Sequence, residues 1–137
     1  MNNIQKVFDR KSLRLHRDRA SAKIYEYDFL FKVLAERLSD KLLDVKRSFS
    51  VALELGCHQQ ILGKALKSTG KVKNIISCDI SEQMISEINC EKAVVDEEFI
   101  PFSKHSFDLV LSSGSFHWVN DVPGSLLQIR NIIRYIF

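Results

Sequence analysis

V-A-L-E-L-G, residues 51–56, is a short and nearly continuous apolar run that ends in glycine. Such a run is typical of a strand that is buried on both faces of a parallel sheet. Helical and strand patterns alternate after it, and this alternation predicts parallel strands joined by right-handed crossovers. We therefore expect an α/β fold with a doubly wound sheet.

The segments downstream of this strand can be placed from their apolar patterns and turn residues. A helix is expected over residues 60–67, and a second strand, N-I-I-S-C-D, over residues 74–79. Ser81 can then cap a helix that continues through Ile88. The remaining expected elements are strands over 92–95 and 107–112 and a final helix from Pro123 to Ile136.

Two helices are expected upstream of the first strand. Between residues 6 and 23 basic side chains outnumber acidic ones, which predicts a basic helical arm with its charges in solvent. From Ile24 to Leu42 apolar residues recur at steps of three and four, so we expect one longer helix with an apolar stripe. We divide the chain into an N-terminal helical arm, residues 1–48, and an incomplete α/β domain, residues 49–137.

The composition limits the classes of protein to consider. Hydrophobic residues make up 45% of the 137 residues and charged residues 27%, as in a soluble globular domain. No apolar run approaches the ~20 residues of a membrane helix, and the net charge of +3 is small, so we expect neither a membrane nor a nucleic-acid partner. The three cysteines show no C-x-x-C spacing, and no metal site is expected.

The ends of the predicted strands carry polar or flexible residues. In an open α/β sheet, ligands lie beyond the carboxyl ends of the strands. A carboxylate after the second strand, Asp79, can accept two ribose hydroxyls, although it can equally cap the helix that starts near Ser81. The layout therefore favours a nucleotide site, with Glu54, Gly56, Asp79, Asp96, Glu97, Ser112 and Ser113 as candidate ligand residues.

Several segments also resemble one known family. V-A-L-E-L-G-C, C-D-I-S-E-Q-M-I, D-E-E-F-I-P-F and S-F-D-L-V-L-S-S-G-S-F-H-W-V-N-D are similar to class I S-adenosylmethionine (SAM)-dependent methyltransferases of the type 11 group. V-F-D-R and H-W-V-N-D resemble the alpha-proteobacterial and mitochondrial branch that includes the protein-arginine hydroxylase of complex I assembly. Malonyl carrier-protein methyltransferases are more distantly similar. The resemblance implies a Rossmann-like fold with strand order 3-2-1-4 and SAM as the cofactor.

The resemblance further implies a role for each candidate residue. Glu54 and Gly56 would belong to the first SAM motif. Asp79 would bind the ribose, and Asp96 with Glu97 would lie near the adenine amino group. Ser112 and Ser113 would line the methionine end of the cofactor. No catalytic residue is identified, because methyl transfer can rely on positioning and electrostatics alone.

One departure from the family pattern concerns the first SAM motif. Members of the family have three glycines at alternate positions, whereas this chain has Gly56, His58 and Gln60. Glycine is used where the backbone approaches a ligand or adopts a positive φ, which costs other residues on the order of 1 kcal/mol. We therefore expect SAM to bind weakly or not at all.

A second departure concerns the end of the sequence. Relatives continue from the last helix into a fifth strand, and we therefore expect this chain to be C-terminally truncated. The fourth strand, with Phe107, Leu109, Val110 and Leu111, would then have an uncovered edge, and such edges recruit partners. The candidate partners are a second copy of the chain, a separately encoded C-terminal half, a protein substrate and an acidic carrier protein.

Three functions remain open at this point. The leading one is a SAM-dependent methyltransferase-like protein linked to complex I assembly, impaired by truncation and by loss of the motif glycines. The main rival is a non-catalytic remnant or protein-interaction module, and the third is a small basic nucleic-acid binder. The expected location is the bacterial cytoplasm or, alternatively, the mitochondrial matrix. His117 and Trp118 are interpreted as packing residues rather than substrate contacts.

Overall fold

The computed structural model describes residues 5–134, and its centre is a four-stranded parallel sheet. Hydrogen bonds join the strands in the order β3-β2-β1-β4. The strands are β1 Phe49–Leu55, β2 Val72–Asp79, β3 Lys92–Val94 and β4 Leu109–Ser112. The predicted α/β fold and the predicted strand order are both confirmed.

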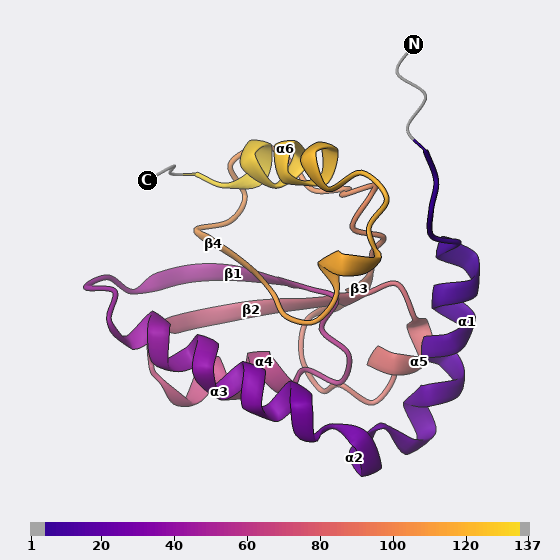
Figure 1. The fold of residues 1–137 in the computed structure, drawn as a ribbon. Helices are drawn as coiled ribbons and strands as arrows, with labels where there is room; N and C mark the ends of the chain where they lie inside the picture. The colour runs from indigo at the N-terminus through magenta and orange to yellow at the C-terminus, as the bar shows by residue number, and fades with distance from the viewer. Residues whose placement is uncertain (1–4, 135–137) are drawn as a thin grey trace.

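Helices cover both faces of this sheet and one of its ends. In Figure 1, α3 and α4 lie below the sheet, α6 lies above it, and α1 stands beside the ends of β1 and β2. The helices are α1 Arg10–Ala20, α2 Ile24–Tyr27, α3 Phe29–Leu43, α4 Ile61–Ser68, α5 Glu82–Ile85 and α6 Val122–Ile132. Short 3-10 turns, η1 Ser21–Lys23 and η2 Phe116–Trp118, follow α1 and β4.

An apolar core lies on each face of the sheet. Ala52 and Leu53 are neighbours in β1 and are both fully buried, because successive side chains of a strand point to opposite faces. The core that Ala52 shares with α3 and α4 also holds Ala35, Leu42, Phe49, Leu62, Leu66, Val72, Ile75 and Leu111. The core that Leu53 shares with α6 also holds Leu55, Cys78, Val95, Phe107 and Ile132.

The apolar stripe upstream of β1 forms two helices, not the single helix that was predicted. α2 ends at Tyr27, and α3 begins after Asp28, whose ψ of 3° interrupts the helix. The Asp28 carboxylate pairs with Lys32 one turn later, at 3.2 Å, which suits a residue at a helix start. The boundary at residue 48 stays a prediction, although α3 shares its core with the strands.

The end of the chain also differs from the prediction. The last helix ends at Ile132, and Ile133 is extended and forms a parallel bridge with Phe107. The Phe107 N–H donates to the Ile132 carbonyl at 3.0 Å, and the Arg134 N–H donates to the Phe107 carbonyl at 2.9 Å. Ile136, where the helix was expected to end, lies outside the residues that the structure describes.

The prediction that the fourth strand has an uncovered edge is therefore wrong for part of that strand. Phe107 and Leu111 are only 2% and 7% exposed, while Leu109 and Val110 are partly buried. The reason is that α6 packs over Phe107 and the segment after α6 lies alongside it.

Candidate functional site

Three acidic side chains are buried near the carboxyl ends of the strands. Glu54 in β1 is 1% exposed, Asp79 at the end of β2 is 0% exposed, and Glu97, which follows β3, is 1% exposed. A carboxylate so far from water is costly unless it is paired and hydrogen-bonded. The partners of these residues therefore define what the site can bind.

Asp79 is surrounded by donors from three parts of the chain. Nη1 of Arg17, in α1, donates to both carboxylate oxygens, at 3.1 and 3.0 Å. The backbone N–H of Ser81 donates to Oδ1 at 3.0 Å, and the backbone N–H of His58 donates to Oδ2 at 2.9 Å. A carboxylate has about four acceptor positions, so those of Asp79 are all in use.

Glu97 and Asp96 are paired with a second arginine of the same helix. Nη2 of Arg10 contacts Asp96 Oδ1 at 2.8 Å and also contacts Glu97. The Ser115 hydroxyl donates to Glu97 at 2.6 Å and accepts from Arg17 Nη2 at 2.9 Å.

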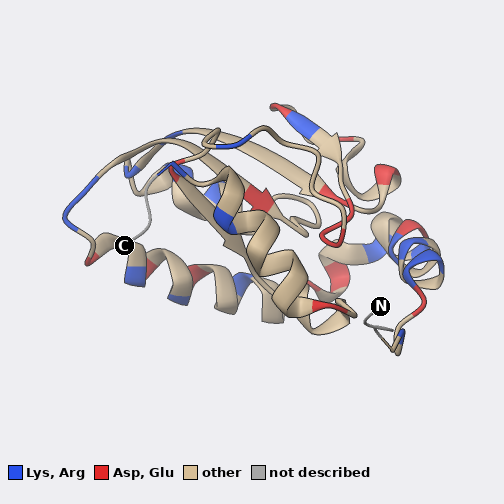
Figure 2. Cartoon of the chain, turned by 90° about the horizontal axis from the view of Figure 1, so that it is seen from above, with Lys and Arg blue, Asp and Glu red and all other residues tan. Residues whose placement is uncertain are grey.

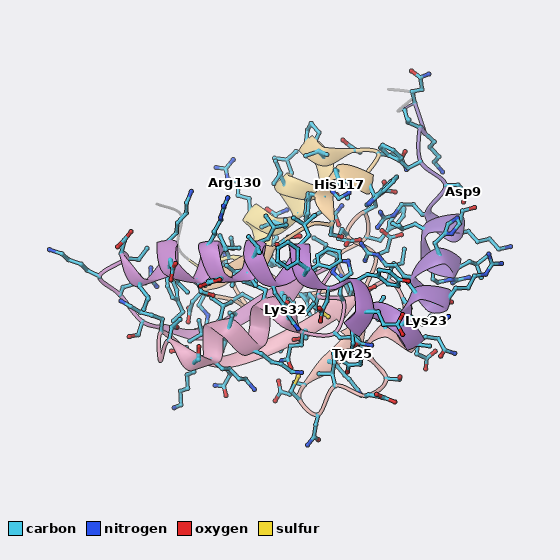
Figure 3. The ribbon with its side chains drawn as sticks, turned by 60° about the horizontal axis from the view of Figure 1, so that its bottom comes forward. Asp9, Lys23, Tyr25, Lys32, His117 and Arg130 are labelled. Carbon is cyan, nitrogen blue, oxygen red and sulfur yellow. The ribbon has the colours of Figure 1, made fainter. Side chains whose placement is uncertain are left out.

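We call Arg10, Arg17, Asp79, Glu97 and Ser115 the strand-end network. Its arginines belong to α1, where basic bands face acidic loop segments (Figure 2). Two turns of helix separate these arginines, so they lie on one face of α1. Asp9 caps the start of this helix, accepting from the N–H of Lys11 and of Ser12, and Lys23 follows its far end (Figure 3). The basic arm thus directs two of its charges at the strand ends.

Glu54 lies outside this network. Its carboxylate accepts from the Ser77 hydroxyl at 3.2 Å and lies so close to Gly63 that a Cβ there would come within 2.5 Å. Burial raises the pKa of Glu54 to about 7, more than the hydrogen bonds from Gly63 and Ser77 lower it. The Glu54 carboxylate therefore lies between β2 and α4, at the small cavity that Gly56 also lines.

The turn after β1 adopts the backbone conformation for which glycine is favoured. Gly56, His58 and Gln60 have φ values of 63°, 52° and 62°. The two replacements at the motif positions therefore occupy left-handed conformations, which is the physical reason for expecting glycine there. The His58 ring packs on Phe31, with centroids 4.2 Å apart. Burial, and then the nearby charge of Arg17, lowers the pKa of His58 to about 4.

The space beside Gly56 is filled by protein atoms. A Cβ on Gly56 would lie 2.2 Å from the Ser115 hydroxyl and 2.9 Å from Glu97 Oε1. The cavity that Gly56 and Ser113 line measures about 10 Å³. Small-molecule sites usually measure roughly 300 Å³ or more, so no nucleoside fits there in this arrangement. Among the described residues, the buried Ser112 hydroxyl at the end of β4 has no hydrogen-bond partner.

Residues 53–135 match the family described as methyltransferase domain. The chain belongs to this family. The methyltransferase domain family implies SAM as the cofactor, in agreement with the resemblance seen in the sequence.

Two curated relatives cover almost the whole chain. "Arginine-hydroxylase NDUFAF5, mitochondrial" of Danio rerio is 38% identical, and the match covers 93% of this chain and 42% of that protein. "Malonyl-[acyl-carrier protein] O-methyltransferase" of Acetivibrio thermocellus is 31% identical over 93% of this chain and 47% of its own length. The chain thus spans less than half the length of these relatives.

Solved structures agree on the fold. A chain of the complex that contains the Haloferax volcanii Trm112 methyltransferase activator matches with a TM-score of 0.74 at 19% identity, over 86% of this chain and 55% of that one. An S-adenosylmethionine-dependent methyltransferase of Mesorhizobium loti matches with a TM-score of 0.60 at 20% identity, over 72% of this chain and 49% of that one.

The methyltransferase domain brings only some of the predicted site residues together. Gly56, Asp79 and Glu97 meet through Ser115 and Arg17, and Asp96 joins them through Arg10. The Glu54 carboxylate approaches Gly63 of α4, and the Ser112 hydroxyl contacts none of them by a hydrogen bond. Glu54 and Ser113 both line the small cavity beside Gly56. Whether each residue contacts cofactor stays a prediction.

Sequence reasoning missed three members of the strand-end network, Arg10, Arg17 and Ser115. The basic arm was expected to face solvent, yet Arg17 is only 6% exposed. The seven-residue spacing of Arg10 and Arg17 was an available signal, because it places two cations on one face of a helix. Ser115 gave no such signal, since its role depends on how the loop after β4 approaches Gly56.

Neither a reactive cysteine nor a metal site is supported by the residues around the strand ends. Burial raises the pKa of the Cys57 thiol far above neutrality and that of Cys78 to about 12, so neither thiol is a nucleophile at neutral pH. Over residues 5–134, no group of three or more His, Cys, Asp or Glu side chains is placed to hold a metal ion.

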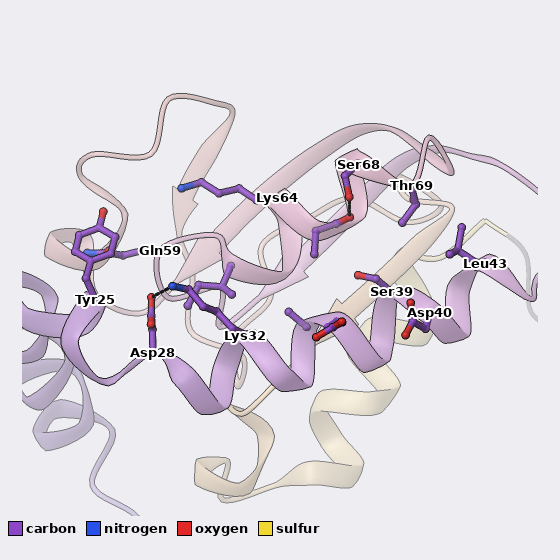
Figure 4. A pocket seen from close by; sticks show the side chains of 14 residues that line it. Tyr25, Asp28, Lys32, Ser39, Asp40, Leu43, Gln59, Lys64, Ser68 and Thr69 are labelled. Atoms are coloured by element: carbon purple, nitrogen blue, oxygen red, sulfur yellow. Dashed lines mark hydrogen bonds and ion pairs between the residues drawn. The ribbon is translucent and has the colours of Figure 1, made fainter.

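Two larger hollows are present. One, of about 820 Å³, lies among α1, α3 and η2. Arg17 of the strand-end network and His58 line it, together with His117 and Lys23 (Figure 3). Beside it, Trp118 packs edge to face on Phe8 with centroids 5.5 Å apart, in line with the packing interpretation, but stays 42% exposed. The other, of about 690 Å³, lies between α3 and α4, where Lys32 pairs with Asp28 (Figure 4).

Proposed function

We propose that this chain acts as a SAM-binding domain of a methyltransferase-type protein, with Asp79 as the acceptor of the ribose hydroxyls. The observation that carries the proposal is the position of Asp79: a buried carboxylate at the carboxyl end of β2, held in place by the backbone N–H groups of His58 and Ser81. This is where an α/β sheet of this kind binds the ribose. Because Arg17 already fills the remaining acceptor positions, we expect SAM to bind weakly.

The acceptor and the cellular setting are part of the same proposal. We propose a protein substrate or an acidic carrier protein, on the basis of relatives named as an arginine hydroxylase and as a malonyl-[acyl-carrier protein] O-methyltransferase. A link to complex I assembly, and a location in the bacterial cytoplasm or the mitochondrial matrix, follow from the resemblance. Within residues 5–134, no helix is long and apolar enough to cross a membrane.

A SAM titration monitored by NMR tests the proposed function. We expect one SAM per chain with a dissociation constant weaker than about 100 μM, and Asp79→Ala should weaken binding about tenfold or more, because a charged acceptor of two hydroxyls is lost. Asp108→Ala is the matched control, since Asp108 is a buried carboxylate at the amino end of the sheet. Equal binding by wild type and Asp79→Ala would contradict the role of Asp79.

The second candidate is a non-catalytic interaction module. The closed state of the strand-end network favours it, because every acceptor position of Asp79 is filled from within the chain. The proposed partners of such a module are a second copy of the chain or a separately encoded C-terminal half that pairs with β4. Complete absence of SAM binding at millimolar SAM, in wild type and in Arg17→Ala, would favour this candidate over the first.

A further inference from the structure

We propose that α1 is a displaceable lid on the strand ends, and that Arg17 and the SAM ribose compete for Asp79. SAM would then bind only to molecules in which α1 has left the position it has here. This inference rests on the proposed SAM site and adds a mechanism that regulates access to it.

The first step of the argument is the number of acceptors on Asp79. Two backbone N–H groups and the Arg17 guanidinium provide four contacts to its two oxygens. The backbone donors belong to the fixed strand ends, whereas Arg17 belongs to α1. Two ribose hydroxyls can therefore be accepted only if Arg17 withdraws.

The second step is that Arg17 also controls the space beside Gly56. Its Nη2 holds the Ser115 hydroxyl at 2.9 Å, and that hydroxyl donates in turn to Glu97. In this position the Ser115 side chain would lie 2.2 Å from a Cβ on Gly56. Withdrawal of Arg17 removes one of the two hydrogen bonds that fix the Ser115 side chain against Gly56, so opening the ribose position also loosens the space next to it.

The third step is that α1 is attached almost entirely by polar contacts. Its one buried residue is Arg17, whereas α3 buries Ala35, Ser39 and Leu42. Further side-chain contacts of α1 are the ion pairs of Arg10, a hydrogen bond from Arg10 Nη1 to the Trp118 carbonyl at 3.1 Å, and a hydrogen bond from Ser81 to Asp18. An element with few buried apolar groups opens at a low free energy compared with the core.

The fourth step is that the exchange conserves the number of hydrogen bonds to Asp79. When Arg17 leaves, its guanidinium returns to water and Asp79 retains the N–H groups of His58 and Ser81. The ribose hydroxyls then replace the donors that Arg17 supplied. The competition is therefore between two sets of donors for one buried carboxylate, and Asp79 keeps a full set of donors on either side.

Calorimetric titration of SAM into three forms of the chain tests the lid. Arg17→Ala should bind SAM about tenfold or more tightly than wild type. In wild type, the molecules in which Arg17 occupies Asp79 cannot bind SAM and so reduce the apparent affinity, and the variant has no such molecules. Arg19→Ala is the control: Arg19 has the same charge, lies on the same helix, is exposed, and forms no ion pair with any residue from 5 to 134. Its affinity should stay within about twofold of wild type. Equal or weaker binding by folded Arg17→Ala would overturn the lid.

Hydrogen exchange of the wild-type chain provides a test that does not depend on the stability of a variant. Saturating SAM should speed amide exchange in Arg10–Ala20, while exchange in α4 should not speed up. Slower or unchanged exchange in α1 with SAM bound would overturn the lid and leave the proposed function intact. If neither wild type nor Arg17→Ala binds SAM, the proposed function fails, and the lid fails with it.

Discussion

Both ends of the sheet hold an aspartate paired with an arginine, and the two pairs differ in their surroundings. At the amino end, Asp108 accepts from the N–H groups of Ser50 and Val51 and lies 3.6 Å from Arg134, whose side chain is 43% exposed. At the carboxyl end, Asp79 lies 3.0 Å from Arg17, whose side chain is 7% exposed.

The same chemistry therefore has different consequences at the two ends. A pair whose cation reaches water, such as Arg134 with Asp108, is screened and contributes about 0–1 kcal/mol, whereas removing one partner of a fully buried pair leaves an uncompensated charge. The amino-end pair fastens the chain after α6 to the start of β1. The carboxyl-end pair closes the position where a ligand would bind, so its strength determines whether the site is available.

The largest effect should come from breaking the buried pair. Arg17→Ala should lower the free energy of unfolding by about 3–5 kcal/mol, because Asp79 stays buried without its cation. Arg134→Ala should lower it by less than about 1 kcal/mol. Urea denaturation at pH 7 measures both. Similar losses for the two variants would show that the contrast between the ends of the sheet is not real.

The pH dependence of stability separates Glu54 from His58. The pKa of His58 is lowered from 6.5 to about 4, so the unfolded chain binds more protons and stability falls as the pH drops from 6.5 to 4. The pKa of Glu54 is raised from 4.5 to about 7, so stability falls as the pH rises from 4.5 to 7. These two slopes oppose each other between pH 4.5 and 6.5.

Glu54→Gln removes the pH dependence of stability that Glu54 contributes and leaves that of His58. The stability of this variant should rise by about 2–3 kcal/mol between pH 4 and 6.5, while the contributions of these two groups nearly cancel in wild type. Thermal unfolding in a pH series measures the difference between the two chains. Parallel pH profiles of the two chains would contradict the raised pKa of Glu54.

A smaller effect concerns the turn that joins β1 to α4. Gln60 has a φ of 62°, whereas its neighbour Gln59 has no positive φ, so the two glutamines form a matched pair. Gln60→Gly should have a net effect close to zero, because it relieves about 1 kcal/mol of left-handed strain but removes the hydrogen bond from Gln60 Nε2 to Cys90 Sγ at 3.0 Å. Gln59→Gly should destabilise by about 1 kcal/mol, because it loosens the backbone and removes the hydrogen bond to the Ser21 carbonyl. Equal losses would show that the strain at Gln60 is negligible.

The sheet could be predicted from the sequence because its signals are local. Each strand is a short apolar run, and the run with Leu53 in β1 is buried as its pattern indicates. Ser81 was also predicted to cap a helix, from its position just before one, and its hydroxyl accepts from the Met84 N–H. The errors concern where helices break or end: the break at Asp28, the end of α5 at Ile85 instead of Ile88, and the end of α6 at Ile132.

The strand-end network could not be predicted in the same way. Arg17 contacts Asp79 across 62 residues of sequence and Ser115 across 98. No local pattern encodes such a meeting, because it depends on how α1 is placed against the completed sheet. The acidic half of the site could be predicted from the strand ends alone, but the basic half could not.

NMR of the arginine side chains tests the closed strand-end network most directly. In a chain labelled with ¹⁵N-arginine, the Nη–H groups of Arg17 should exchange slowly with water, because both nitrogens are buried in hydrogen bonds to Asp79 and Ser115. Asp79→Asn should speed that exchange, and the exposed Arg19 should exchange fast in both chains. If Arg17 exchanges as fast as Arg19 in wild type, the site is open in solution and the account is wrong.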